Sequence, residues 1–117
     1  MHLSRLQDEV TPWANHNFGV PGHDPTRTRV GSTLGLCEEV GEVARAVLKQ
    51  HQGIRGTFEE WQDEIIKELG DVVIKCAEVA AICGIDLNAA VARRWFDVQE
   101  RDFKKDAQGH GLPQEEN

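Results

Sequence analysis

Residues 28–83 read TRVGSTLGLCEEVGEVARAVLKQHQGIRGTFEEWQDEIIKELGDVVIKCAEVAAIC. Apolar residues recur every three or four positions on both sides of a short break, a spacing typical of amphipathic helices. The first of these helices is expected to span residues 28–50. Thr57, followed three residues later by Glu60, has the pattern of a capping box, which predicts a second helix over residues 57–83. Because few residues separate them, the two helices are expected to pack as an antiparallel hairpin.

A further helix is expected before this hairpin, over residues 2–17. Ser4 and Gln7 have the spacing of a capping box at its start. Pro12 lies inside the helix, so the helix either kinks there or restarts with Thr11 as its N-cap. The residues that follow are rich in glycine and proline and predict a loop.

A fourth helix is expected after the hairpin, over residues 86–105, with Asp86 as its N-cap. No stretch alternates apolar and polar residues for long enough to indicate a strand. The sequence therefore predicts an all-α fold: a four-helix bundle-like protomer with a long antiparallel helical hairpin, assembled as a homo-oligomer. Residues 1–105 are expected to form this single domain, and residues 106–117 a flexible C-terminal tail.

The composition excludes several classes of protein. A length of 117 residues corresponds to one domain. The net charge of −7 repels phosphate backbones, so a nucleic acid polymer is not an expected partner. No apolar run is long enough to cross a membrane, and the first residues lack the hydrophobic segment of a signal peptide. Three cysteines without close pairing fit free thiols, so we expect a cytoplasmic protein.

Two pairs of acidic residues lie in the hairpin helices. Glu39 and Glu42 share one helix face, as do Glu68 and Asp71, because each pair is separated by three positions. Apolar residues flank both pairs, so these carboxylates are expected at the margin of faces that pack against other helices. Two charges about 4 Å apart repel by roughly 4 kcal/mol at an effective dielectric of 20, which favours a neutralising cation. Carboxylate oxygens suit Mg²⁺ or Mn²⁺; each pair taken alone is also common on a solvated helix face.

Three glycines occupy the interiors of the same two helices: Gly35, Gly41 and Gly70. Glycine destabilises a helix interior by about 1 kcal/mol relative to alanine. Their presence therefore predicts that another helix or a ligand approaches closely at these positions.

The acidic residues form a longer motif, Glu38-Glu39-x-x-Glu42, then 25 residues, then Glu68-x-x-Asp71. This motif resembles the signature of the MazG-like group of all-α nucleoside triphosphate pyrophosphohydrolases. The resemblance extends over about residues 5–105 and includes four further parts of the sequence: Thr11-Pro12-Trp13-Ala14, Asn17-Phe18-Gly19, the loop 52–56, and, in the last helix, residues 95–98 with Arg101 and Asp102.

The resemblance implies a hydrolase that cuts between the α- and β-phosphates of a nucleoside triphosphate, giving a nucleoside monophosphate and pyrophosphate. Glu39, Glu42, Glu68 and Asp71 would be ligands of Mg²⁺, with Mn²⁺ as an alternative. Glu38 would be the catalytic residue that orients or deprotonates the attacking water. The resemblance also implies a homodimer or homotetramer with the site near a subunit interface, and a role in clearing nucleotides.

Three basic residues are candidates for contacts with the phosphates of a nucleotide. Lys75 follows Asp71 by one helical turn, and the alternative for it is an ordinary salt bridge within the helix. Arg94 and Arg101 lie seven residues apart on the expected last helix, and exposed arginines without a ligand are the more common case.

Trp13 and Asn17 are candidates for contacts with the base, together with Phe18. An aromatic face can stack on a base and an amide can bond its edge. The alternative is that Trp13 and Phe18 belong to the hydrophobic core.

Two functions other than catalysis also fit the sequence. One is a non-catalytic helical module that kept the bundle and binds a partner. The other is a regulatory bundle that binds metal without nucleotide, which would bind Mn²⁺ tightly but would not be stabilised by nucleotides.

Overall fold

The computed structural model describes residues 2–108, and this part of the chain is helical without strands. Four helices make it up: α1 (Leu3–Phe18), α2 (Arg29–Gln52), α3 (Phe58–Ile82) and α4 (Leu87–Val98). The all-α prediction is confirmed. None of these helices combines the length and the apolar character that a membrane span requires.

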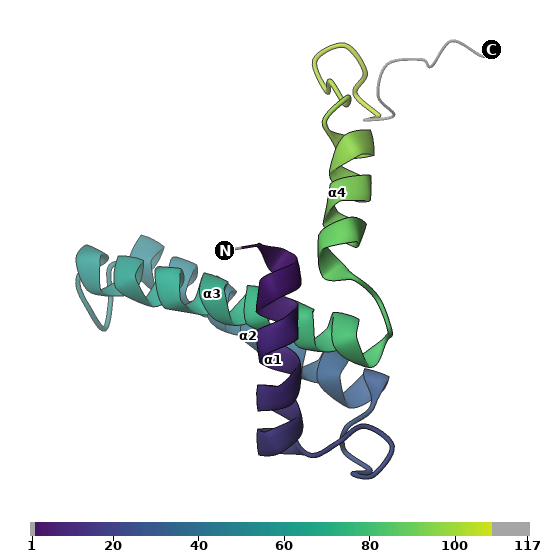
Figure 1. Cartoon of the computed structure of the whole chain (residues 1–117). Helices are drawn as coiled ribbons and strands as arrows, with labels where there is room; N and C mark the ends of the chain where they lie inside the picture. The colour runs from purple at the N-terminus through teal and green to yellow at the C-terminus, as the bar shows by residue number, and fades with distance from the viewer. Residues whose placement is uncertain (1, 109–117) are drawn as a thin grey trace, which may run out of the picture. The chain divides into compact units, whose positions relative to one another are not determined.

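The helical hairpin is confirmed: α2 and α3 pack side by side along their lengths (Figure 1). The hydroxyl of Thr28 accepts the Gly31 N–H at the start of α2, and Gly53 ends that helix in the left-handed conformation, with φ of 65°. At the start of α3, both bonds of the predicted capping box are present: the Thr57 hydroxyl accepts the Glu60 N–H at 3.1 Å, and the Glu60 carboxylate accepts the Thr57 N–H at 3.2 Å.

The start of α1 differs from its prediction. His2, not Ser4, is the N-cap, and its side chain makes no capping bond. The helix continues through Pro12 without a restart. Gln7, which the sequence placed in a capping box, instead bonds the backbone of residues 85–87: its amide donates to the Ile85 carbonyl at 2.7 Å and accepts the Leu87 N–H at 2.9 Å. This pair of bonds fastens α1 to the turn that follows α3.

The buried core between α1 and α3 is small. Val10 and Ala14 of α1 meet Ala77 of α3, with Leu6 and Leu87 packed against them. No large side chain is fully buried anywhere in the described part of the chain. Close packing of small residues brings the α1 and α3 backbones together but removes little apolar surface from water.

Helix α4 is shorter than predicted and ends at Val98 rather than near residue 105. The side chain of Asp102 accepts the backbone N–H groups of Lys104 and Lys105 at 3.0 and 3.3 Å. A carboxylate that bonds nearby N–H groups in this way competes with the helical hydrogen-bond ladder and favours a turn.

The contacts divide the chain into two compact units, Met1–Leu87 and Asn88–Asn117. The first unit contains the hairpin, α1 and all the candidate metal ligands. The predicted tail begins at residue 106, and most of it lies outside the described residues.

Candidate functional site

The site is built along the line where α2 and α3 face each other, here called the α2–α3 seam. Four pairs of residues face each other across this seam: Ser32 with Glu78, Gly35 with Lys75, Glu39 with Asp71, and Glu42 with Glu68. Their numbers rise along α2 as they fall along α3, as antiparallel helices require. Spacings of three and four residues keep each set on one helix face. The seam therefore passes from a polar end, through Lys75, to a group of carboxylates.

The acidic cluster consists of Glu39, Glu42, Glu68 and Asp71. Oxygen atoms of Glu39, Glu42 and Glu68 lie within 4.8 Å of one another, and Glu68 is 4 % exposed. The Asp71 charge acts on both Glu39 and Glu68. One oxygen each of Glu39 and Glu68 is buried and has no hydrogen-bond partner. Such atoms are costly unless a ligand satisfies them.

Glu68 is the carboxylate most strongly affected by its neighbours. Its pKa is raised from 4.5 to about 7, first by hydrogen bonds shared with the carboxyl groups of Glu42 and Glu64, then by burial and by the charges of Glu42 and Asp71. Without a cation, the cluster therefore holds a proton near neutral pH.

The pKa of Glu39 is also raised, first by burial and then by the charges of Glu42, Asp71 and Glu38. The positive charge of Lys75 opposes this shift. Carboxylates this crowded can be neutralised by protons or by a hard cation such as Mg²⁺.

Two further residues lie beside the cluster. Glu64 is one turn before Glu68 on α3, and Lys67 places its ammonium 3.6 Å from Glu64 and 3.9 Å from Glu68. Glu64 was not among the ligands expected from the sequence. The signal for it is present, because residues 64, 68 and 71 continue the spacing of one helix face.

Glu38, the candidate catalytic residue, is exposed and lies at the edge of the cluster. Its charge contributes to the raised pKa of Glu39, which places the two carboxylates close together. A catalytic role for Glu38 remains a prediction.

A pocket of about 190 Å³ lies at the polar end of the seam. Phe18, Arg27, Ser32, Lys75 and Glu78 are among the residues that line it. This volume is below the roughly 300–1,000 Å³ of a pocket that encloses a drug-sized ligand. The pocket can therefore receive only part of a nucleotide.

The aromatic residues of α1 are not core residues. Trp13 and Phe18 are 52 % and 44 % exposed, and their rings meet edge to face with centroids 5.5 Å apart. The Lys75 ammonium lies 5.3 Å from the Phe18 ring. Asn17 uses its amide to bond the Trp13 carbonyl at 2.8 Å. Phe18 lines the pocket, whereas neither Trp13 nor Asn17 does.

Arg94 and Arg101 belong to the second compact unit. Arg94 is exposed on α4, whereas Arg101 follows the end of that helix, so the prediction that both lie on one helix is wrong. Their contacts with a nucleotide remain predictions.

The three helix glycines differ in their surroundings. A side chain at Gly35 would meet Lys75, with the added β-carbon 3.2 Å from the ammonium nitrogen. At Gly41 and Gly70, nothing in residues 2–108 beyond the neighbouring backbone of the same helix lies within 4 Å of the corresponding position. Among these three glycines, the described part of the chain confirms a close approach at Gly35 and shows none at Gly41 or Gly70.

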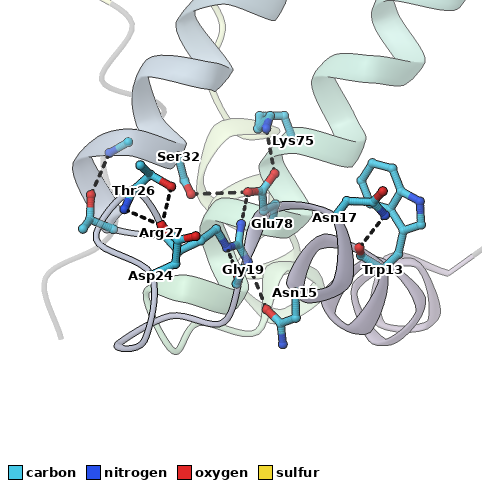
Figure 2. Close-up of polar contacts among 12 residues, drawn as sticks. Trp13, Asn15, Asn17, Gly19, Asp24, Thr26, Arg27, Ser32, Lys75 and Glu78 are labelled. Atoms are coloured by element: carbon cyan, nitrogen blue, oxygen red, sulfur yellow. Dashed lines mark hydrogen bonds and ion pairs between the residues drawn. The ribbon is translucent and has the colours of Figure 1, made fainter.

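A buried ionic group that was not expected from the sequence lies at the polar end of the seam. Arg27, from the connection before α2, donates to the carboxylate of Glu78 on α3 (Figure 2). Arg27 and Glu78 are 5 % and 4 % exposed. The sequence signal for Glu78 is its position three residues after Lys75 on the same helix face. A loop arginine carries no comparable signal.

The family model of the MazG nucleotide pyrophosphohydrolase domain matches residues 28–102, which include the four acidic residues and Lys75. Trp13 and Asn17 lie outside the matched range. No curated protein and no solved structure matches the chain. Because the match covers more than half of the chain and includes both helices of the seam, this protein belongs to the MazG nucleotide pyrophosphohydrolase domain family.

Proposed function

We propose that the protein is a Mg²⁺-dependent hydrolase that cleaves nucleoside triphosphates between the α- and β-phosphates. The products would be a nucleoside monophosphate and pyrophosphate, and the role the clearance of nucleotides from the cytoplasmic pool. The observation that carries the proposal is the acidic cluster, in which two buried carboxylate oxygens lack hydrogen-bond partners. Membership of the family supports the reaction class.

Glu39, Glu42, Glu68 and Asp71 would hold Mg²⁺, and Mn²⁺ suits the same oxygen ligands. The buried, unpartnered oxygens of Glu39 and Glu68 fit this assignment because a cation would satisfy them. Bound Mg²⁺ would neutralise triphosphate charge and lower the pKa of water.

Glu38 would accept a proton from the attacking water. As the water oxygen bonds to the α-phosphorus, the bond between that phosphorus and the oxygen bridging to the β-phosphate breaks. The electron pair of this bond leaves with pyrophosphate. The Lys75 ammonium would contact phosphate oxygens at the next position along the seam. Four further residues are proposed to contact the nucleotide: Trp13, Asn17, Arg94 and Arg101.

The test is a hydrolysis assay with a panel of nucleoside triphosphates, with and without Mg²⁺. Release of pyrophosphate and monophosphate from at least one of them, only when Mg²⁺ is present, is expected. Absence of hydrolysis across the panel would contradict the proposal and favour a non-catalytic module. Metal binding without any effect of nucleotide on stability would favour a metal-binding regulatory bundle.

The pH dependence of stability gives a second test of the metal site. Because folding raises the pKa of Glu68 from 4.5 to about 7, the folded state holds a proton that the unfolded state has lost between these values. Without metal, the melting temperature is therefore expected to fall as the pH rises from about 4.5 to about 7, and then to change little.

Mg²⁺ is expected to raise the melting temperature more at pH 8 than at pH 5.5, because ligands must lose their protons to bind it. Calorimetric scans at both pH values check this. The variant Glu68→Gln should weaken the dependence of the metal-free melting temperature on pH. Glu9→Gln, at an exposed position of α1, should leave that dependence unchanged. An unchanged melting curve in millimolar Mg²⁺ would count against the site.

A homodimer or homotetramer is proposed because the described chain leaves much apolar surface uncovered. On α2, Val30 and Leu34 are 70 % and 65 % exposed, and Ile66 of α3 is 63 % exposed. The small core between α1 and α3 does not compensate for this exposure. A second copy of the chain offers matching apolar helix faces.

Light scattering is expected to give a solution mass of at least two chains of 13.1 kDa. Leu34→Glu should reduce the mass and the melting temperature, because it places a charge on the exposed apolar face of α2. Val20→Glu is the matched control, since Val20 is exposed in the connection between α1 and α2. A monomeric wild-type protein would contradict the proposal.

A further inference from the structure

The buried group at the polar end of the seam has no part in the proposed metal site, and its bonds converge on Glu78. One oxygen of Glu78 accepts from Arg27 and, at 3.4 Å, from the Ser32 hydroxyl. The other oxygen accepts from the Lys75 ammonium at 2.7 Å (Figure 2). Glu78 thus holds the ammonium of Lys75 in a fixed place.

Glu78 is itself held from outside the hairpin. Arg27 donates through its Nε to the Gly19 carbonyl at 2.8 Å and through a terminal nitrogen to the Asn15 side chain at 3.1 Å. The guanidinium is planar and rigid, so these bonds fix its direction toward Glu78. The end of α1 and the connection before α2 therefore determine where the Glu78 carboxylate lies.

A buried ion pair of this kind adds little to the stability of the fold, because the loss of hydration of both charges offsets most of their attraction. The charges around Glu78 include two cations, Arg27 and Lys75, and a second anion, because the charge of Asp24 acts on Arg27. Lys75 is the more accessible cation, with a side chain 20 % exposed against 5 % for Arg27, and both line the pocket. An ammonium group in this place can reach an anionic ligand.

Lys75 has two possible sets of anionic neighbours. Asp71 lies one turn before it on the same helix, and Glu39 faces Asp71 across the seam, so the acidic cluster is within reach of a lysine side chain. The bond to Glu78 draws the ammonium the other way, toward the pocket that both residues line. Gly35 leaves room for it there, since a β-carbon at this position would lie 3.2 Å from the ammonium nitrogen.

We propose that Glu78 is a positioning residue that holds the Lys75 ammonium away from the acidic cluster and beside the pocket. This inference rests on the proposed function, in which the cluster binds Mg²⁺ and Lys75 binds phosphate. Without Glu78, Lys75 swings to the carboxylates and competes with the metal. With Glu78 in place, the cluster stays available for the cation and the ammonium for the triphosphate.

The test is a double-mutant cycle on Mg²⁺ affinity, measured by calorimetry on nucleotide-free protein. Glu78→Gln is expected to weaken Mg²⁺ binding about tenfold, because the amide nitrogen cannot accept from Lys75 and the ammonium moves to the cluster. Lys75→Met is expected to bind Mg²⁺ at least as tightly as the wild type. The double variant should match Lys75→Met, since no lysine remains to compete.

The same four proteins are compared in triphosphate hydrolysis. Glu78→Gln and Lys75→Met should each raise KM about tenfold, the pattern of a lost binding contact, and the double variant should show no further rise. Glu9→Gln is the matched control, because it breaks an exposed ion pair with Arg5 in α1. It should leave both KM and the Mg²⁺ affinity unchanged.

Glu78→Gln leaves the Arg27 charge buried without its anion, which can prevent folding. If it does, Glu78→Asp replaces it in the cycle. This variant keeps a negative charge beside Arg27 but is one methylene shorter, so it cannot hold both Arg27 and Lys75. The same loss of Mg²⁺ affinity, abolished by Lys75→Met, is expected.

An equal loss of Mg²⁺ affinity in the presence and absence of Lys75 would overturn the inference, because Glu78 would then act through the fold alone. Unchanged Mg²⁺ affinity in the Glu78 variants would also overturn it. A wild-type protein that binds Mg²⁺ but hydrolyses no triphosphate would overturn the proposed function, while the metal-binding cycle still decides the role of Glu78. Absence of Mg²⁺ binding in the wild type would overturn both.

Discussion

Glu39→Gln and Asp71→Asn are each expected to abolish Mg²⁺-dependent triphosphate hydrolysis while leaving the fold intact. Glu39 presents a buried oxygen without a partner, and Asp71 faces it across the seam. The amide variants keep the shape of each side chain but remove a charge that would hold the cation. We expect kcat/KM to fall by at least about 10²–10³, the loss that follows removal of one group stabilising transition-state charge.

The stability of the same variants distinguishes a ligand from a structural residue. In the metal-free protein, the charges of Glu42, Asp71 and Glu38 oppose ionisation of Glu39. Removal of one negative charge relieves this repulsion, so the melting temperature without metal should hold or rise. The increase caused by Mg²⁺ should shrink or disappear.

Asp63→Asn is the matched control for Asp71→Asn, because Asp63 is exposed on the same helix. It should retain both activity and the response to Mg²⁺. Hydrolysis at the wild-type rate in both Glu39→Gln and Asp71→Asn would show that the cluster is not the metal site. A large fall in metal-free stability would show instead that these carboxylates support the fold.

The hairpin could be predicted from the sequence because its ends depend on local chemistry. A threonine followed by a glutamate three residues later satisfies the first N–H groups of α3 whatever lies around them, and both bonds are present at Thr57 and Glu60. Gly53 similarly ends α2 through its own backbone freedom, at a φ of 65°. The four acidic residues were brought together as expected because spacing within each helix places them on one face.

The predictions that failed depend on contacts between distant segments or on competing local bonds. Ser4 and Gln7 have capping-box spacing, but Gln7 bonds the turn at Ile85, 78 positions away. The last helix was expected to continue to residue 105, but beyond its end at Val98 the side chain of Asp102 bonds the backbone N–H groups of Lys104 and Lys105 in a turn. The role of Arg27 also depends on contacts between distant segments. Arg27 lies in an irregular connection, where no periodicity indicates the direction of a side chain.

Glu38→Gln is expected to lower the turnover number by at least about tenfold, since general base catalysis typically contributes 10²–10⁴. Glu38 lies about 100° around α2 from Glu39, so the two side chains cannot easily share one ligand direction. It lies one turn before Glu42 and is exposed at the edge of the cluster, where water can reach it. A carboxylate in this position can accept a proton from water without holding the metal.

The decisive comparison for Glu38→Gln is between turnover and Mg²⁺ affinity. If Glu38 is a base, calorimetry should give nearly the wild-type Mg²⁺ affinity, and the rate should fall at every Mg²⁺ concentration. Glu59→Gln, an exposed glutamate in the first turn of α3, is the matched control and should retain both. If affinity falls in step with turnover, Glu38 is a ligand. The base would then be sought at Glu64, which with Glu68 flanks the Lys67 ammonium, rather than at Glu78, whose oxygens are occupied by Arg27 and Lys75.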